Sequence, residues 1–205
     1  ADTVAYFLAQ GVAVKVISGD NPHTVSVIAT AAGAPAADQP MDGRDLPDGG
    51  DELADVMEQR SVFGRITPQQ KRAMVIALHA RGHVVAMTGD SVNDVLALKE
   101  ADVGVAMGSG SPAARSVAQL VLLDSSFAAF PAVVAEGRRV IANVERVANL
   151  FVTKTVYATL LALAVGVAHV AYPFLPRHYT IVSGLSIGIP AFFLAFAPAT
   201  EPARP

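Results

Sequence analysis

Cysteine is absent from the 205 residues, which excludes disulfides, thiolate metal sites and a cysteine nucleophile. Clusters of lysine and arginine large enough to follow a phosphate backbone are also missing, and the formal net charge is -3 at pH 7, so no nucleic-acid partner is expected. Formal charge is scarce late in the chain, because Arg177 is the sole charged residue between Thr155 and Thr200. Acidic and basic residues are mixed up to residue 146. These absences predict a soluble domain joined to a membrane segment.

The apolar part of the chain is long enough to cross a bilayer twice, in two runs separated by a proline-containing turn. Several basic residues precede the first run and Arg177 alone lies in the turn, which predicts a cytoplasmic soluble domain on a multi-pass protein of the cell membrane. A buried hairpin of a large soluble protein is the alternative. We predict a cytoplasmic domain over 1–126, a stalk helix over 127–149 and a transmembrane α-helical hairpin over 150–198, with helices at about 150–172 and 179–197.

The first 126 residues alternate short β-rich apolar runs with helix-compatible segments. The segment 33–50 is rich in alanine, aspartate, proline and glycine without a period, and is expected to be a surface loop. Strands are expected at 12–17, 62–66, 84–87, 103–107 and 120–123, and helices at 24–32, 52–59, 68–80, 92–101 and 112–118. This alternation predicts an α/β fold with a parallel sheet and helices on both faces, whose strand ends gather at one ligand-binding edge.

The segment from Met87 to Asp94, M-T-G-D-S-V-N-D, carries the strongest chemical signal. It turns the chain at the carboxyl end of a predicted strand, and Asp90 and Asp94 follow at i, i+4 spacing, so both carboxylates can point into one crevice. Oxygen ligands of this kind suit Mg2+, which keeps several waters and bridges to a phosphate. The alternative is that Asp90 merely caps the next helix.

The same segment resembles a motif of one known family. Thr88 to Leu98, T-G-D-S-V-N-D-V-L-A-L, is similar to the hinge motif T-G-D-G-V-N-D-x-x-A-L of P-type cation-transporting ATPases, and Ala101 to Gly108 resembles the A-D-I-G-I-A-M-G that follows it. The resemblance extends over essentially the whole chain. It implies a haloacid-dehalogenase-like parallel sheet that forms part of a phosphorylation domain. Ser91 departs from the motif, because the family usually has glycine there, and serine avoids strain only at negative φ.

Two further segments match the phosphoryl site of that family. Ser18-Gly19-Asp20 resembles its T-G-D loop, and Lys71 occupies the place of the lysine that pairs with the phosphoryl group. Taken alone, these are a common turn and a surface lysine, while Asn93 either binds the phosphoryl group or braces its loop. The resemblance implies the catalytic residues Lys71, Asp90, Asn93 and Asp94, the cofactor-binding residues Ser18, Gly19, Asp20 and Gly89, and the metal ligands Asp90 and Asp94, with Mg2+ and ATP as cofactors.

The implied chemistry needs a group that this sequence lacks. The phosphorylated aspartate of the family lies in D-K-T-G-T, and no Asp-Lys pair occurs here. We therefore interpret the chain as a fragment whose partners are ATP, a transported cation, membrane lipid and the missing remainder of the same pump. Two other functions stay open. A membrane-tethered haloacid-dehalogenase-type phosphatase would have to use Asp20 as its nucleophile, whereas a non-catalytic module of that fold would not need Lys71, Asp90 and Asp94 together.

The second apolar run has features of a cation path. Pro190 removes the N–H that would bond the Ser186 carbonyl in an α-helix, and a freed carbonyl beside the Ser183 hydroxyl can help to coordinate a cation. A packing kink is the alternative. Neither apolar run contains a carboxylate, and V-S-G-L-S-I-G-I-P-A-F-F-L-A resembles bacterial, actinobacterial-type cation pumps, for which calcium is the leading expected substrate.

Overall fold

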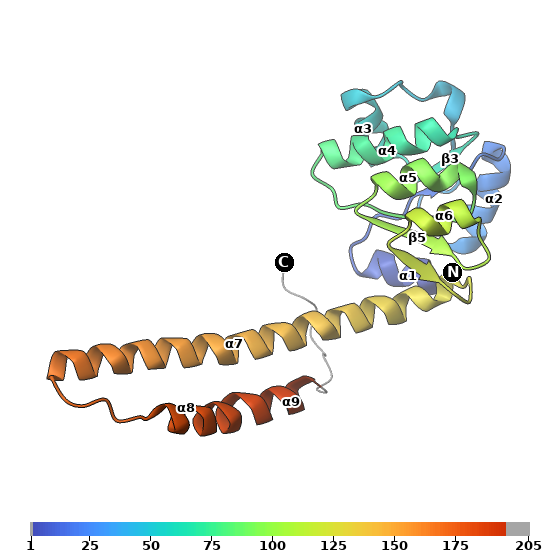
Figure 1. The fold of residues 1–205 in the computed structure, drawn as a ribbon. Helices are drawn as coiled ribbons and strands as arrows, with labels where there is room; N and C mark the ends of the chain where they lie inside the picture. Colours follow the sequence, from blue (N-terminus) through green and yellow to red (C-terminus); the bar gives the residue numbers. More distant parts are fainter. Residues whose placement is uncertain (1, 196–205) are drawn as a thin grey trace. The chain divides into compact units, whose positions relative to one another are not determined.

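The computed structural model describes residues 2–195 and divides into two compact units, one ending at Pro131 and the other starting at Ala132. The first unit alternates helices and strands (Figure 1). Its helices are α1 (Asp2–Ala9), α2 (Pro22–Ala32), α3 (Gly50–Gln59), α4 (Pro68–Ala80), α5 (Val95–Glu100) and α6 (Pro112–Val117). Its strands are β1 (Val16–Ile17), β2 (Met41–Asp42), β3 (Val62–Gly64), β4 (Ala86–Gly89), β5 (Val103–Met107) and β6 (Leu120–Leu122), with short 3-10 turns η1 (Gly43–Asp45), η2 (Val92–Asp94) and η3 (Phe127–Ala129).

The strands of the described residues form two parallel sheets of three strands each, in the orders β1-β3-β2 and β4-β5-β6. In the first sheet, Phe63 of β3 pairs with Ile17 on one side and Met41 on the other. In the second, Val105 of β5 pairs with Thr88 and Leu120. The predicted α/β fold with parallel strands is confirmed, and the strands of the described residues fall into two sheets.

The break between the sheets leaves β1 and β4 each with one edge that no strand of the described residues pairs with. Neither strand contains a fully buried residue, and Ala86 of β4 is exposed. By contrast, Val62 and Phe63 of β3 and Val105 and Ala106 of β5 are 0% exposed. Interior strands of a parallel sheet are normally covered on both faces and paired on both edges. The open edges of β1 and β4 are therefore suited to receive a further parallel strand.

Helix α4 begins at a position that places Lys71 in its first turn. Thr67 and Gln70 form a capping box, in which the Gln70 N–H donates to Thr67 Oγ1 at 3.2 Å and the Thr67 N–H donates to Gln70 Oε1 at 3.0 Å. Pro68 occupies the first helical turn, where its missing N–H is tolerated. Farther along, Met74 packs into the core formed by α3, β3 and α4, so the helix is held firmly under Lys71.

Several elements differ from the sequence-based prediction; the strand expected over 12–17, for example, is limited to Val16–Ile17. The segment expected to be a loop contains β2, a strand of two residues beside the buried Gly43, which is too short to give a periodic signal. Strand β4 lies two residues later than predicted, since Val84 is 84% exposed and pairing with β5 begins at Ala86. The helix expected over 92–101 is divided into η2 and α5, because the Asp94 carboxylate turns back to bind the preceding turn.

The second unit is a helical hairpin (Figure 1). Its first helix, α7 (Phe130–Ala168), belongs to the stretch Phe127–Ala168, which is the one helix of the described residues long and apolar enough to cross a membrane. The chain then returns alongside it through α8 (Pro176–Ser183), the π-helix η4 (Gly184–Gly188) and α9 (Ile189–Ala195). The prediction of a long apolar helix is confirmed. Residues 196–198 of the predicted hairpin lie outside the described residues.

The π-helix brings a further carbonyl, that of Leu185, into the position that lacks a donor because of Pro190. In η4 the Ile189 N–H donates to the Gly184 carbonyl, five residues earlier. With the same spacing of five residues, the N–H of residue 190 would donate to the Leu185 carbonyl. Pro190 has no N–H, so this hydrogen bond cannot form. The Leu185 carbonyl therefore lacks the donor that would follow in this register. The loss expected at the Ser186 carbonyl stays a prediction. The Ser186 hydroxyl donates to a backbone carbonyl four residues earlier at 2.6 Å.

Candidate functional site

The carboxyl ends of β1 and β4 border one cavity of about 480 Å3. The loop after β1, the turn after β4 and the first turn of α4 all contribute to its wall. Each of the eight residues proposed from the sequence lines it, namely Ser18, Gly19, Asp20, Lys71, Gly89, Asp90, Asn93 and Asp94. The structure therefore brings together three motifs that are far apart in the sequence.

Lys71 and Asp94 form a buried ion pair in the cavity wall. Lys71 Nζ lies 2.7 Å from Asp94 Oδ1, and the two residues are only 8% and 5% exposed. Burial on its own raises the pKa of the Asp94 carboxyl. The hydrogen bond from Lys71 and the donors of Ser91 outweigh burial and hold that pKa below its usual value. Asp94 is therefore ionised at neutral pH and holds the Lys71 ammonium in place.

Ser91 fits the turn and adds to the support of Asp94. Its φ of -107° and ψ of 165° lie in the extended region, so the serine causes no backbone strain. Its hydroxyl accepts the Asn93 N–H at 3.2 Å and donates to Asp94 Oδ2 at 3.0 Å. The same Oδ2 accepts the N–H groups of Asp90 and Ser91 at 3.2 and 3.1 Å. The departure from the glycine of the family motif thus supplies one more donor to this carboxylate.

Asp90 differs from Asp94 in being open to the cavity. Its side chain is exposed, and its carboxylate has no hydrogen bond or ion pair within the part of the chain that the structure describes. Its backbone is fixed, because the Asp90 carbonyl accepts the Ser111 N–H at 2.7 Å. The structure therefore presents a free carboxylate on a rigid turn, which is the arrangement a metal ligand needs.

Two glycines allow this close packing. A Cβ at Gly89 would lie 2.4 Å from Asp94 Cβ, and a Cβ at Gly110 would lie 2.7 Å from the Asp90 carbonyl oxygen. Gly110 and Ser111 were missed as site residues by the sequence analysis. The sequence G-S-G-S after β5 predicts a turn at these two residues. It does not indicate that this turn contacts Asp90.

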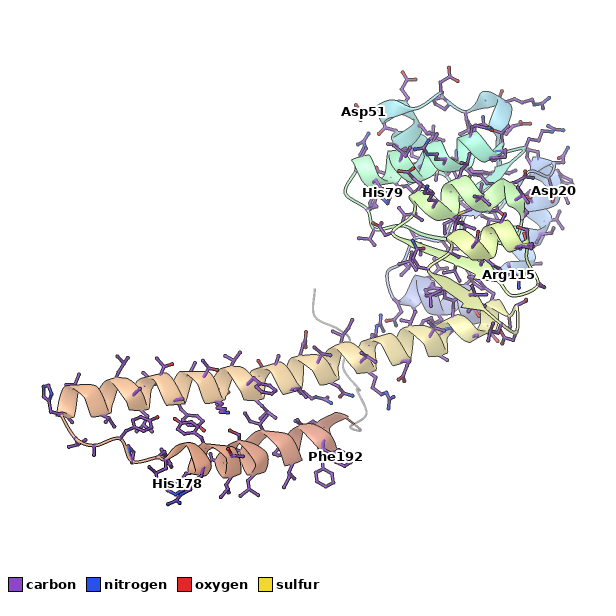
Figure 2. The ribbon with its side chains drawn as sticks, viewed as in Figure 1. Asp20, Asp51, His79, Arg115, His178 and Phe192 are labelled. Atoms are coloured by element: carbon purple, nitrogen blue, oxygen red, sulfur yellow. The ribbon has the colours of Figure 1, made fainter. Side chains whose placement is uncertain are left out.

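The loop after β1 is anchored to β3 and leaves Asp20 near the domain surface (Figure 2). The Ile66 N–H donates to the Ser18 carbonyl at 3.0 Å, and the Arg65 N–H donates to the Asp20 carbonyl at 2.7 Å. Ser18 Oγ donates to Asp20 Oδ2 at 3.1 Å and accepts the Asp20 N–H at 3.2 Å. Cavity-lining hydroxyl and backbone groups of this loop are suited to bind phosphoryl oxygens.

The oxygen ligands at this site suit Mg2+ better than they suit a metal ion that binds through protein side chains alone. Within the described residues, no group of three or more His, Cys, Asp or Glu side chains can hold a metal ion. Mg2+ does not need such a cage, because it keeps several waters and is bound through one or two carboxylates and substrate phosphates. No described residue donates a hydrogen bond to the Asp90 carboxylate. The Asp94 carboxylate, by contrast, already accepts four hydrogen bonds. The Asp90 carboxylate is therefore better placed than that of Asp94 to bind Mg2+ directly. Asp94 instead holds Lys71.

Comparison with known proteins first gives the class of the unit that ends at Pro131. A family model described as haloacid dehalogenase-like hydrolase matches residues 1–102. A solved structure of a zinc-transporting PIB-type ATPase in its E2.Pi state superposes with a TM-score of 0.65 at 20% identity, covering 95% of this chain and 26% of that one. At this identity the likeness concerns the fold alone.

Sequence relatives then give the family. The calcium-transporting ATPase CtpE of Mycobacterium tuberculosis is 56% identical over 214 residues, which cover 100% of this chain and 27% of the relative. The probable cation-transporting ATPase exp7 of Streptococcus pneumoniae is 40% identical, covering 98% of this chain and 27% of its own length. The chain belongs to the P-type cation-transporting ATPases, and it spans about a quarter of the length of these relatives.

Proposed function

We propose that this chain is the carboxyl-proximal part of an ATP-driven cation pump that works through an aspartyl-phosphate. The observation that carries the proposal is the Lys71–Asp94 ion pair beside Asp90, whose carboxylate has no partner among the described residues, in one cavity at the ends of two parallel sheets. A haloacid dehalogenase-like domain and the pump relatives support it. The family generally uses ATP and Mg2+, and the finer assignment to these residues is part of the proposal.

The cavity residues act on the transferred phosphoryl group mainly through charge and position, which are the main requirements of phosphoryl transfer. Lys71 neutralises its oxygens, and Asp94 orients the Lys71 ammonium. Asp90 binds Mg2+, which supplies further positive charge to the same oxygens when bound. Asn93 and Gly89 shape the turn, while the Ser18-Gly19-Asp20 loop donates hydrogen bonds on the nucleotide side.

The acceptor aspartate comes, in this proposal, from a strand that pairs with the open edges of β1 and β4. The residues that follow β1 and those that follow β4 line the same cavity, so a parallel strand between the two would end at that cavity. The relatives are far longer than this chain, which gives room for such a strand in the remainder of the pump. An aspartate at its carboxyl end would face Lys71 and Asp90.

The 205-residue chain alone is therefore expected to release no phosphate from ATP, because the acceptor and the nucleotide domain lie outside it. The measurement is phosphate release by the purified chain with ATP and Mg2+. Asp20→Asn is the informative variant, since Asp20 is the nucleophile in the phosphatase alternative. Turnover that this variant abolishes would replace the pump proposal with the phosphatase.

The membrane half is proposed to follow the division 1–126, 127–149 and 150–198, with the phosphorylation domain in the cytoplasm and two helices in the cell membrane. The long apolar α7 and the membrane nature of the relatives support this arrangement. Calcium is the proposed transported cation, because the mycobacterial relatives are named calcium-transporting. Phe192 of α9 is 63% exposed and points away from α7, as a lipid-facing side chain would (Figure 2).

Pro190→Ala tests whether η4 contributes to the cation path. Alanine supplies the N–H that Pro190 lacks, so the Leu185 carbonyl gains a donor and is lost as a cation ligand. We expect transport and cation-stimulated phosphorylation of the complete pump to require more calcium, at an unchanged amount of protein in the membrane. An unchanged calcium requirement would mean that the proline serves packing alone.

A further inference from the structure

The turn of the helical hairpin gathers three aromatic side chains. Tyr172 and Phe174 lie between α7 and α8, and Tyr179 lies in the first turn of α8. The Tyr172 and Tyr179 rings are stacked, with centroids 6.4 Å apart and an interplanar angle of 12°, and their hydroxyls form a hydrogen bond. The Phe174 ring meets these two rings edge-on, at centroid distances of 6.4 and 5.7 Å. This aromatic triad therefore fixes the turn to the start of the returning helix.

In the proposed membrane arrangement, the turn lies at the level of the lipid head groups. The part of α7 from Val147 to Ala168 measures about 33 Å, at about 1.5 Å per residue. The hydrocarbon core of a bilayer is about 30 Å thick. With its first end at the cytoplasmic surface, this part of α7 brings the turn to the opposite surface. Tyrosine is enriched at that level, because its ring is apolar and its hydroxyl is polar.

Arg177 adds a positive charge to the same turn. Its side chain is exposed, and its guanidinium has no hydrogen bond or ion pair with any residue that the structure describes. No aspartate or glutamate occurs between Arg146 and Thr200 to neutralise it. At the next position, His178 Nδ1 accepts the Leu175 N–H at 3.4 Å, which leaves the N–H at Nε2 as a donor. The start of α8 (Figure 2) thus carries donors and positive charge without a carboxylate in the hairpin to receive them.

These features fit the phosphate of a lipid better than a free phosphate ion. A guanidinium presents several N–H groups in one plane, which match two phosphate oxygens at once. Beside Arg177, apolar surface is exposed at Tyr172, Phe174 and Leu175, which are 39%, 37% and 50% exposed. A free ion gains nothing from that surface, whereas a lipid joins a phosphate to apolar chains in one molecule. A lipid with net negative charge gains most, because basic residues near the membrane surface attract it.

We propose that the turn of the hairpin binds the phosphate group of an anionic membrane lipid. Arg177 supplies the charge, His178 Nε2 supplies a second donor, and the aromatic triad contacts the glycerol region of the lipid. A bound lipid then fixes the depth of the turn in the membrane. This inference rests on the proposed function, because it assumes that the hairpin spans the bilayer. It gives an interaction surface to a segment that takes no part in phosphoryl transfer.

The test uses a fluorophore placed in the turn of the complete pump. Val170, which lies in the turn and is 59% exposed, is replaced by cysteine and labelled. This chain contains no cysteine, so the label is unique once any cysteine elsewhere in the pump has been replaced. The pump is reconstituted in phosphatidylcholine vesicles that contain increasing amounts of a nitroxide-labelled lipid, which quenches the fluorophore on contact. Labelled phosphatidylglycerol is expected to quench at a lower mole fraction than labelled phosphatidylcholine.

The substitutions at Arg177 show whether this preference depends on its charge. Arg177→Gln is expected to raise the half-quenching mole fraction of phosphatidylglycerol about fivefold and to leave that of phosphatidylcholine unchanged. Arg177→Lys keeps the charge and is expected to retain most of the preference. Arg115→Gln is the matched control, because it removes an exposed arginine from α6 in the first unit, and it is expected to have no effect.

Each other result contradicts the inference in a recognisable way. Equal quenching by the two lipids in the wild type, or an unchanged preference in Arg177→Gln, would overturn it. Loss of the preference in an excess of inorganic phosphate would show that the turn binds a free phosphate ion instead. No quenching by either lipid would place the turn outside the membrane, and the proposed membrane arrangement would fail together with the inference. Failure of the lipid site alone is therefore distinguishable from failure of the proposed function.

Discussion

Asp90→Asn is expected to abolish phosphorylation of the complete pump by ATP, with a loss of about 100-fold or more in the rate. The Asp90 carboxylate is exposed to the cavity and free of protein partners within the described residues, so its charge is available for Mg2+. Asparagine keeps the size of the side chain and removes the charge. The backbone bonds that hold the turn do not use the Asp90 side chain, so the fold is expected to survive. The measurement is acid-stable phosphoenzyme formed from labelled ATP.

Ser91→Gly is the control for that experiment, because it changes the adjacent residue of the same turn. It removes the hydroxyl that donates to Asp94 Oδ2 and accepts the Asn93 N–H. Replacing a serine cap by glycine lowers the free energy of unfolding by only about a few tenths of a kcal/mol. Phosphoenzyme formation is expected to stay intact or become faster. Phosphorylation retained in Asp90→Asn would show that the Asp90 carboxylate is not needed to bind Mg2+. The helix-cap alternative would not gain from that result, because Ser91 is the residue that caps η2.

Much of the first unit and of its candidate site was predictable, because both depend on local patterns. The position of Pro68 after Thr67 predicted where α4 begins, and hence that Lys71 lies in its first turn. The i, i+4 spacing of Asp90 and Asp94 placed both carboxylates at the end of one strand. Since parallel strands end at one edge, residues after β1 and β4 were expected to meet, and they line one cavity.

The rest depended on tertiary contacts that no local pattern reports. Whether Ser91 strains the turn depended on its φ, which is negative because the Asp94 carboxylate binds back to the turn. The different states of the two carboxylates also required the structure, since Asp94 is saturated by donors from three residues while Asp90 is free. The break between the two sheets could not be predicted, because the sequences of β1 and β4 do not show which strands pair with them.

The hairpin shows the same division between local and tertiary information. A proline within an apolar helix predicts a lost hydrogen bond, and Pro190 has that effect. The π-helix before it shifts the register by one residue, so that the Leu185 carbonyl is also left without a donor by Pro190. Nothing in the sequence pattern fixes such a shift, because π-turns depend on packing as well as on residue type.

Lys71→Met is expected to destabilise the first unit by about 3 kcal/mol, because it leaves the buried Asp94 carboxylate without its cation. It also changes the response to acid. In the wild type the lowered pKa of Asp94 stabilises the fold above the carboxyl's unfolded pKa, and this contribution is lost as the pH falls through the lowered folded value. Without Lys71, the folded-state pKa of Asp94 is expected to be higher than in the wild type, so protonation of this carboxyl in acid destabilises the variant less. The difference in unfolding free energy between wild type and variant, followed by circular dichroism, is therefore expected to shrink as the pH falls.

The double variant Lys71→Met/Asp94→Asn separates stability from chemistry. Removing both charges leaves no unpaired buried ion, so the stability lost in Lys71→Met is expected to be largely recovered. Phosphoenzyme formation by the complete pump is expected to stay abolished in both variants, because the phosphoryl oxygens lose the Lys71 ammonium in each. If the double variant regained phosphorylation together with stability, Lys71 would be a structural partner of Asp94, and the charge that stabilises the phosphoryl group would have to come from another residue.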